Sequence, residues 1–105
     1  MSKSPTQKSL AYLRSQGWQV AIVEHWNAHA GIRQDVWHFG DLLASKVGRT
    51  EDEGAIALVQ VTSKSNMAAR RKKIQASTEA SEWKLANGFI ILHGWDGAKL
   101  TEEWL

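Results

Sequence analysis

Three polar side chains have the types and spacing to act on a phosphate together. Gln60 and Thr62 end an otherwise apolar segment, residues 55–62, which has the length and composition of a buried strand. Because side chains alternate along a strand, these two project from one face. Asp41 follows Gly40 in the preceding apolar segment. If the segments are neighbours in a sheet, an acid, an amide and a hydroxyl meet beyond a hydrophobic floor, where a divalent cation and a phosphate could be held together.

Positive charge follows this polar strand end. Residues 54–78 contain no Asp or Glu, but they hold five of the thirteen Lys and Arg residues of the chain. Four of the five are consecutive, at 70–73, in a stretch that we expect to be a helix capped by Ser65 or Asn66. The N-terminus of such a helix, together with Lys64, offers N–H groups and cations to a phosphate. The ordinary alternative for consecutive charges is a solvated helix face.

The overall composition is that of one globular domain. The chain has 105 residues, of which 43% are hydrophobic and 23% charged, so we expect a single domain over residues 1–105. It contains no cysteine, which excludes disulfide bonds, thiolate zinc sites and a thiol nucleophile. No apolar run approaches the roughly 20 residues of a membrane helix, and the start lacks the apolar core of a signal peptide. We therefore expect a cytoplasmic protein with no membrane partner.

Helix and strand signals alternate along the chain. We expect, in order, a helix at 5–16, strands at 18–26, 35–44 and 55–62, helices at 65–75 and 77–86, a strand at 89–93 and an edge strand at 99–105. Gly40 interrupts the second strand, where a bulge would redirect Asp41. A mixed sheet with helices on its faces is the natural architecture for this order, so the predicted fold class is α/β.

Aromatic and histidine side chains allow further interpretations. The tryptophans that we expect in the core are Trp18, Trp37 and Trp83. Trp26 lies beside a polar loop, so it either packs or stacks on a nucleic-acid base. The histidines that could form a metal cluster are His25, His29 and His38. The first two straddle a strand end and do not share a helix face, so this is the weaker metal site.

Two stretches of the sequence resemble a nuclease superfamily. They are Arg33-Gln-Asp-Val-Trp-His-Phe-Gly-Asp41-Leu-Leu-Ala and Leu58-Val-Gln-Val-Thr-Ser63, the second followed by Asn66 and an Ala-Ala-Arg-Arg-Lys-Lys-Ile helix. In these features the chain resembles the small phage and bacterial members of the PD-(D/E)XK nuclease superfamily, relatives of Holliday junction resolvases and VRR-Nuc domains. The resemblance runs from Thr6 to Trp95. It implies a restriction-endonuclease-like αβββαβ core, with a mixed central sheet of four to five strands flanked by helices.

The resemblance also implies site residues. Asp41 takes the place of the motif Asp, Gln60 that of the second acid, and Thr62 that of the motif Lys. Lys64 is two residues beyond Thr62, so it lies on the same face if the strand continues and would then substitute for the missing lysine. The candidate catalytic residues are therefore Asp41, Gln60, Thr62 and Lys64, with Asp41 and Gln60 as metal ligands.

The charge of this set indicates that further metal ligands are needed. Mg²⁺ prefers octahedral oxygen ligands and is usually anchored by one or two carboxylates together with waters and phosphate. Asp41 supplies one carboxylate, and the Gln60 amide is neutral. Asp35 and Glu24 are the candidates for a second carboxylate. The expected cofactor is Mg²⁺ or Mn²⁺.

The first functional hypothesis is an enzyme. It is a Mg²⁺- or Mn²⁺-dependent DNA endonuclease that hydrolyses phosphodiester bonds in structured or branched DNA, similar to a Holliday junction resolvase. The residues expected to contact DNA are Lys64, Asn66, Arg70, Arg71, Lys73 and Arg33. The resemblance implies a homodimer, because cutting two strands needs two sites, and a prokaryotic or phage-infected host cell.

Two alternatives keep the fold without cleavage. One is a DNA-binding module that has lost catalysis. The other is a subunit that pairs through its sheet or its Trp-rich surface with a larger protein. Metal binding at Asp41 separates the enzyme from the binding module, because a hydrolase needs the ion whereas a binder needs only cationic side chains.

Overall fold

The computed structural model describes residues 3–48 and 53–105, with the exception of the Arg33 side chain. Its elements, in chain order, are α1 (Pro5–Ser15), β1 (Gln19–Ile22), β2 (His25–Asn27), β3 (Ile32–Gln34), β4 (Leu42–Lys46), β5 (Ala55–Ser63), η1 (Lys64–Asn66), α2 (Met67–Gln75), α3 (Thr78–Leu85), β6 (Phe89–Asp96) and β7 (Lys99–Trp104). The element η1 is a short 3-10 turn that leads into α2. No helix in these ranges is long and apolar enough to cross a lipid bilayer.

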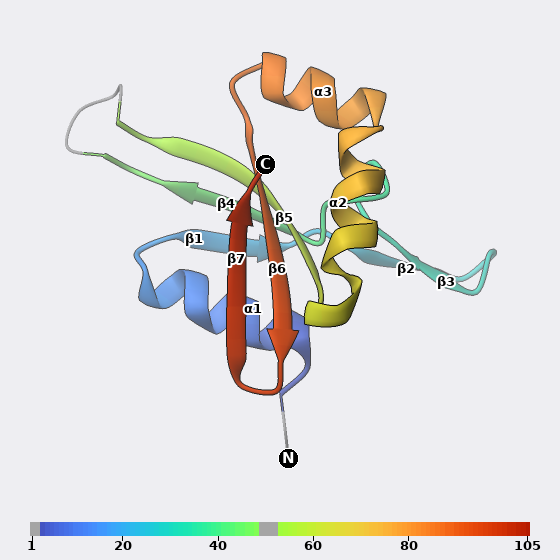
Figure 1. The fold of residues 1–105 in the computed structure, drawn as a ribbon. Helices are drawn as coiled ribbons and strands as arrows, with labels where there is room; N and C mark the ends of the chain where they lie inside the picture. The colour runs from blue at the N-terminus through green and yellow to red at the C-terminus, as the bar shows by residue number, and fades with distance from the viewer. Residues whose placement is uncertain (1–2, 49–52) are drawn as a thin grey trace.

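A mixed sheet of five strands forms the centre of the described structure, in the order β1-β4-β5-β6-β7 (Figure 1). β5 and β6 run parallel, and the other neighbours run antiparallel. A parallel pair needs a crossover connection, which α2 and α3 provide. The predicted α/β class, with a mixed sheet flanked by helices, is confirmed. When β2, β3, η1 and α3 are left out, the elements α1, β1, β4, β5, α2 and β6 stand in the expected αβββαβ order.

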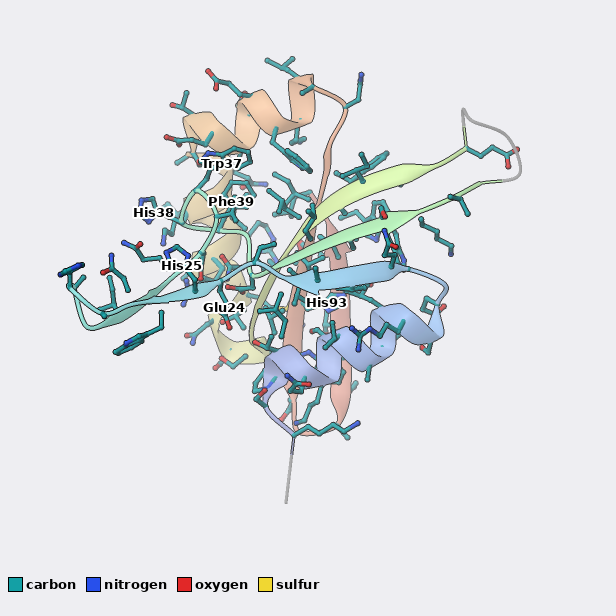
Figure 2. The ribbon with its side chains drawn as sticks, turned by 180° about the vertical axis from the view of Figure 1, so that it is seen from behind. Glu24, His25, Trp37, His38, Phe39 and His93 are labelled. Atoms are coloured by element: carbon teal, nitrogen blue, oxygen red, sulfur yellow. The ribbon has the colours of Figure 1, made fainter. Side chains whose placement is uncertain are left out.

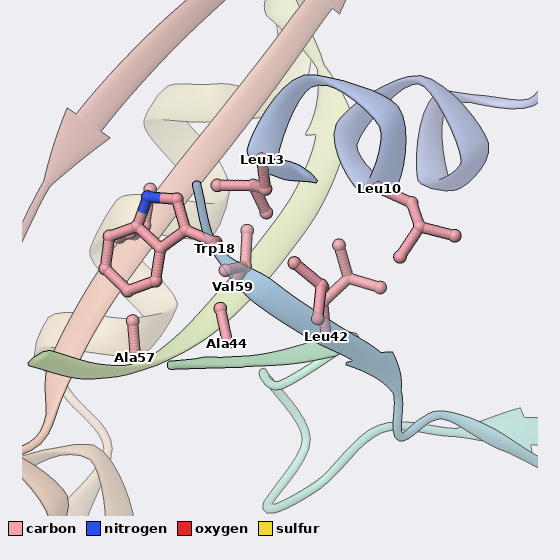
Figure 3. Close-up of a cluster of buried hydrophobic side chains, with 9 residues drawn as sticks. Leu10, Leu13, Trp18, Leu42, Ala44, Ala57 and Val59 are labelled. Carbon is pink, nitrogen blue, oxygen red and sulfur yellow. The ribbon is translucent and has the colours of Figure 1, made fainter. Parts of the chain in front are cut away.

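The first hydrophobic cluster lies between α1 and the sheet. Ser4 Oγ accepts a hydrogen bond from the Gln7 N–H at 3.2 Å and so caps α1, and Gly17, with φ of 92°, follows the helix end. The buried residues of the cluster are Leu10, Leu13, Trp18, Val20, Leu42, Ala44, Ala57, Val59 and Ile91 (Figure 3). Trp18 is 9% exposed, which confirms its predicted core position.

The second hydrophobic cluster lies on the opposite face, under α2 and α3. Its buried residues are Phe39, Leu58, Met67, Ile74, Ala80, Ile90 and Leu92. Leu58 and Val59 are consecutive in β5, so the two clusters must occupy different faces of the sheet. By the same alternation, Gln60 lies on the face that α2 covers. Trp83 is partly buried against this cluster.

The predicted strand at 18–26 is wrong as a single element. β1 covers only part of it, and β2 pairs with β3 in a separate two-stranded sheet of the described chain (Figure 1). The chain reverses after Asn27, whose Oδ1 accepts hydrogen bonds from the N–H groups of His29 and Ala30 at 3.0 and 3.1 Å. This local reversal pairs β2 with the chain that follows it, and the resulting β2–β3 hairpin stands apart from the main sheet.

The predicted strand at 35–44 is confirmed only in its second half, where β4 lies. Its first half is a tight turn in which Val36 and Gly40 exchange backbone hydrogen bonds of 2.9 and 2.8 Å. Trp37 and His38 have φ values of 52° and 66°, a left-handed conformation that is incompatible with a strand. The expectation that Trp37 lies in the core is wrong, because the turn leaves it 48% exposed.

Candidate metal centre

Asp41 is fixed by backbone hydrogen bonds on both sides. Its N–H donates to the Val59 carbonyl at 2.9 Å, and its carbonyl accepts from the N–H groups of Val23 and Glu24 at 3.0 and 3.4 Å. Asp41 precedes β4, and because β4 is antiparallel to β5, the start of β4 lies beside the end of β5. The residue is only 4% exposed, so its side chain is held in a buried position at this strand end.

The carboxylate of Asp41 binds the end of β5. Oδ2 accepts hydrogen bonds from Gln60 Nε2 and from the Val61 N–H, both at 2.7 Å. The Val61 N–H can be reached by a side chain because the β4–β5 pairing starts at Leu42 and Val59, so β5 extends beyond its neighbour. The structure therefore brings together the acid and the amide that the sequence places at this strand end.

Two further carboxylates join Asp41. Among the described residues, Glu24, Asp35 and Asp41 each place a carboxylate oxygen within 4.8 Å of the other two. Glu24 directly precedes β2 and Asp35 directly follows β3, so the two ends of the β2–β3 hairpin deliver them to one point. Figure 2 shows Glu24 at this base of the hairpin. We call these three residues the acidic cluster; it includes none of the histidines of the alternative metal site.

The surroundings of Asp41 change its protonation. Burial, and next a hydrogen bond with Asp35, raise the pKa of Asp41 to about 8, and the negative charges of Asp35 and Glu24 act in the same direction. The hydrogen bond from the Val61 N–H opposes this shift. A carboxyl group so placed holds a proton at neutral pH unless a cation takes the place of that proton.

The Gln60 side chain offers a further oxygen ligand. Gln60 is 2% exposed, and its Oε1 has no hydrogen-bond partner among the described residues. A buried oxygen left in this state costs on the order of 1–3 kcal/mol. A half-turn of the amide would direct Oε1 to the place where Nε2 now meets Asp41. Carboxylate and amide oxygens are ligands that Mg²⁺ and Mn²⁺ prefer, so the residues present fit a hard divalent cation.

Thr62 lies on the same face of β5 as Gln60, whereas Lys64 lies beyond the end of this strand. Thr62 is 8% exposed and, being two residues along β5, lies on the same face as Gln60. β5 ends one residue before Lys64, which begins η1, so the alternation that would place Lys64 on this face does not reach it. Arg71 and, to a smaller extent, Lys64 lower the pKa of Glu103 in β7, which places the Lys64 charge near that strand.

The cations of α2 are not equivalent. Arg71 forms a bidentate ion pair with Glu103, in which Nη2 lies 2.7 Å from Oε2. The Arg71 side chain, which we expect from the sequence to contact DNA, is therefore paired with Glu103 of β7. Lys72 and Lys73 are exposed, and Arg70 is half-buried. These three side chains supply the positive surface of the helix.

The predicted side-chain cap of the basic helix is wrong. Asn66 occupies the N-cap position and is exposed, but it makes no side-chain capping hydrogen bond within the described structure. The physical reason is that η1 runs directly into α2, so the Met67 N–H donates to the Lys64 carbonyl. The side chain of Arg33, another candidate DNA contact, lies outside the described residues.

A buried polar network on the α1 face is not predicted by the sequence. Ser9 Oγ lies 2.7 Å from His93 Nδ1, and His93 Nε2 lies 2.8 Å from Glu102 Oε2. The Trp95 indole N–H donates to Ser9 Oγ at 2.8 Å. Ser9 and His93 are fully buried, whereas Glu102 is exposed, so the network joins α1 to β6 and reaches the surface at β7. Its one sequence signal is a histidine directly after the apolar run 89–92.

Comparison of the chain with protein-family models, with curated proteins and with solved structures found no match. What the chain does is therefore inferred from its own residues. The acidic cluster and the buried Gln60 amide beside it are the strongest chemical features of the described surface and core.

Proposed function

We propose that the protein is a divalent-metal-dependent DNA endonuclease of the PD-(D/E)XK superfamily, and that Asp41, Glu24 and Asp35 hold Mg²⁺ or Mn²⁺. One observation carries the proposal: three carboxylates meet within 4.8 Å at the end of β5, and the pKa of the buried one is raised to about 8. Negative charges held so close repel one another, and burial penalises them as well. A bound cation would relieve both effects.

The arrangement also accounts for the departures from the superfamily motif. Gln60 and Thr62 stand where the motif has an acid and a lysine, so β5 itself contributes no charge to the site. Glu24 and Asp35 bring negative charge to the same point from the base of the β2–β3 hairpin. With Asp41, they give the site three carboxylates, which meets the requirement for the one or two by which Mg²⁺ is usually anchored.

The chain's own residues position the reacting groups. When bound, the cation would supply an activated water and neutralise charge that develops on the phosphate. The Val61 N–H and the Gln60 amide hold Asp41 Oδ2, and backbone hydrogen bonds on both sides hold its main chain. The Thr62 hydroxyl, on the Gln60 face, is assigned to donate a hydrogen bond to a phosphate oxygen.

DNA is the proposed substrate because of the charge around the site. Lys72, Lys73 and Arg70 belong to α2, which packs on the face of the sheet that carries Gln60. Lysine and arginine side chains that neutralise phosphates release counterions, which favours binding at low salt. We propose structured or branched DNA, a homodimer that cuts two strands with two sites, and a location in the cytoplasm of a prokaryotic or phage-infected cell.

A DNA-binding module without cleavage is the second candidate, and Thr62 favours it. A neutral hydroxyl replaces the lysine that the superfamily uses at this position, so the strand provides no positive charge to orient a water or to stabilise the phosphate. In that case the acidic cluster needs no cation, and the α2 side chains carry the DNA affinity.

Cleavage assays separate the two candidates. Single-stranded, duplex, flap and four-way-junction DNA are incubated with Mg²⁺, Mn²⁺ or EDTA and with either the wild type or Asp41→Asn. We expect the wild type to cut a branched substrate only with metal, and Asp41→Asn to bind DNA without cutting it. DNA binding by both proteins with no cleavage favours the binding module. If neither protein binds or cuts DNA, both candidates are excluded. The remaining hypothesis is then that the chain is a subunit of a larger assembly.

A further inference from the structure

The turn between β3 and β4, which joins two members of the acidic cluster, carries an exposed aromatic side chain, Trp37. Two backbone hydrogen bonds between Val36 and Gly40 close the turn at its base. The residues that flank it, Asp35 and Asp41, both belong to the cluster. Trp37 follows Asp35 by two peptide units, so their Cα atoms are at most about 7.6 Å apart. A short, closed piece of backbone therefore ties the indole to the candidate metal centre.

The tip of this turn has a conformation that its residue types disfavour. Tight turns with positive φ at both central positions usually contain Asn-Gly or a similar pair, because larger side chains clash with the backbone there. Trp37 and His38 nevertheless occupy these positions with φ values of 52° and 66°. Unfavourable backbone conformations of this kind concentrate where a side chain serves a function.

Trp37 forms one wall of an aromatic hollow. Its ring stacks on Phe39, with 6.4 Å between centroids and 30° between planes, and lies 6.0 Å from the ring of Trp83 in α3. Figure 2 shows Trp37 and Phe39 close together beneath α3. These contacts support the indole while leaving it 48% exposed. The hollow has a volume of about 540 Å³, and its other walls include His38, Lys73 and the start of α3.

The polar groups around the hollow match a nucleotide. Lys73 lines it, and Lys72 is exposed on the same helix, so positive charge is present for a phosphate. The acid in the lining is Glu79, which accepts a hydrogen bond from Ser77 Oγ at 3.3 Å. A carboxylate can also accept a hydrogen bond from the exocyclic amino group of a base. The exposed part of the Trp37 indole offers aromatic surface on which any base can stack.

We infer that Trp37 and this hollow bind one unpaired nucleobase, which stacks on the indole while Lys73 contacts its phosphate. The inference rests on the proposed function, because it takes the ligand to be DNA, and it specifies which feature of the DNA is recognised. A bulge, a flap or an open junction offers an unpaired base, whereas a fully paired duplex does not. The turn then holds that base at a fixed position relative to the acidic cluster.

Binding in EDTA tests this inference in the absence of cleavage. A duplex with a single-base bulge and the same duplex without the bulge are titrated with the wild type, with Trp37→Leu and with Trp104→Leu. Leucine keeps apolar volume against Phe39 and Trp83 but removes the aromatic face. Trp104 is the matched control, because it is also 48% exposed but lies in β7, in contact with Trp18.

We expect the wild type to prefer the bulged duplex, and Trp37→Leu to lose affinity for it by roughly 5- to 150-fold, which corresponds to the ~1–3 kcal/mol of one stacked base. Affinity for the paired duplex stays unchanged. Trp37→Phe keeps most of the preference, and Trp104→Leu keeps all of it. Equal wild-type affinity for the two duplexes overturns the inference, as does a loss in Trp26→Leu in place of Trp37→Leu. If the wild type binds neither duplex in EDTA, the inference fails as well, and the cleavage assay with metal then decides the proposed function separately.

A second readout uses only the wild-type protein. A fluorescent 2-aminopurine is placed at the bulged position, where stacking on an indole quenches its emission. We expect the emission to fall when the protein binds in EDTA. An unchanged or increased emission at saturating protein contradicts stacking of the base, even where the affinity for bulged DNA is high.

Discussion

At the scale of single residues, Asp41 performs two tasks that have different requirements. It completes the end of β5 by accepting the Val61 N–H, and it contributes to the acidic cluster. The first task needs only an acceptor oxygen, whereas the second needs a negative charge. Asparagine satisfies the first requirement and fails the second, so Asp41→Asn separates the structural role from the proposed metal-binding role.

Gln60→Glu tests whether the Gln60 position in β5 belongs to the proposed metal site. The new carboxylate would be buried beside Asp41, so we expect the metal-free protein to lose on the order of 1–3 kcal/mol of stability at neutral pH. With saturating Mn²⁺ the loss should be offset, because a fourth carboxylate strengthens cation binding. Thermal unfolding with and without Mn²⁺ measures both effects. A variant whose Mn²⁺-induced shift is no larger than that of the wild type argues against Gln60 as a ligand position.

His93 determines part of the pH dependence of stability. Burial lowers the pKa of His93, and the hydrogen bond to Glu102 opposes that shift only in part. The unfolded chain takes up a proton near pH 6.5, whereas buried His93 does so only at lower pH. The stability present above pH 6.5 is therefore lost as the pH falls below that value. The Ser9 hydroxyl and the Tyr12 ring also face the imidazole.

Urea unfolding at about pH 7.5 and about pH 5 measures this loss, to which one histidine contributes at most ~1.4 kcal/mol per pH unit. We expect His93→Gln to be less stable than the wild type at the higher pH, but to lose less stability on acidification. The account of the buried network would be wrong if both proteins showed the same dependence on pH.

At the scale of elements, the β2–β3 hairpin and the turn that follows it assemble the site. The hairpin brings Glu24 and Asp35 to Asp41, and the turn that carries Trp37 joins Asp35 to Asp41 along the chain. These segments were the least predictable from sequence. Alternation along β5 predicts the Asp41–Gln60 pair, whereas the approach of Glu24 to Asp35 depends on a chain reversal whose signal is one asparagine side chain. A Trp-His pair is also not one of the residue pairs typical of turns with positive φ, so the sequence does not predict the left-handed turn.

The predictable elements are those with strong local signals. α1 has an N-terminal cap and a glycine beyond its end, and β5 has a continuous apolar run of strand length. The Ser9–His93 contact is different, because it joins residues 84 positions apart and depends on how α1 docks on the sheet. Such contacts between distant segments leave no periodic pattern in the sequence.

Because α2 carries exposed positive charges, we expect DNA binding to weaken as the salt concentration rises. Each phosphate contact contributes a slope of about −0.9 to log affinity against log salt on duplex DNA. We expect the double variant Arg70→Gln, Lys73→Gln to flatten this slope by roughly two units in a titration series at increasing salt. Arg71→Gln should change it less, because Arg71 is paired with Glu103.

The matched control for this series is Lys3→Gln, Lys99→Gln, which removes the same charge away from α2. We expect its slope to stay close to that of the wild type. Equal flattening by the two double variants would mean that only net charge matters, and α2 would then be an ordinary solvated face.

At the scale of the whole molecule, the two faces of the main sheet differ in what they carry. One face has a structural polar network, and the other has the Gln60 amide of the candidate site. The α1 face holds the Ser9–His93–Glu102 network, and the opposite face holds α2 and the Gln60 amide at the strand end. The central strands β5 and β6 belong to both faces, so a change that loosens either cluster reaches the site through the same backbone. A test of the site must therefore distinguish lost ligands from lost folding.

Thermal unfolding with and without Mn²⁺ makes that distinction for the central claim, that Asp41, Glu24 and Asp35 bind a divalent cation. A ligand that binds only the folded state stabilises it by about 2.7 kcal/mol at 100 times its Kd. For a domain of this size we predict a rise in Tm on the order of 10 °C for the wild type. The rise should vanish in Asp41→Asn and persist in Asp96→Asn, an exposed acid at the end of β6. An unchanged wild-type Tm, or an equal rise in both variants, would contradict the claim.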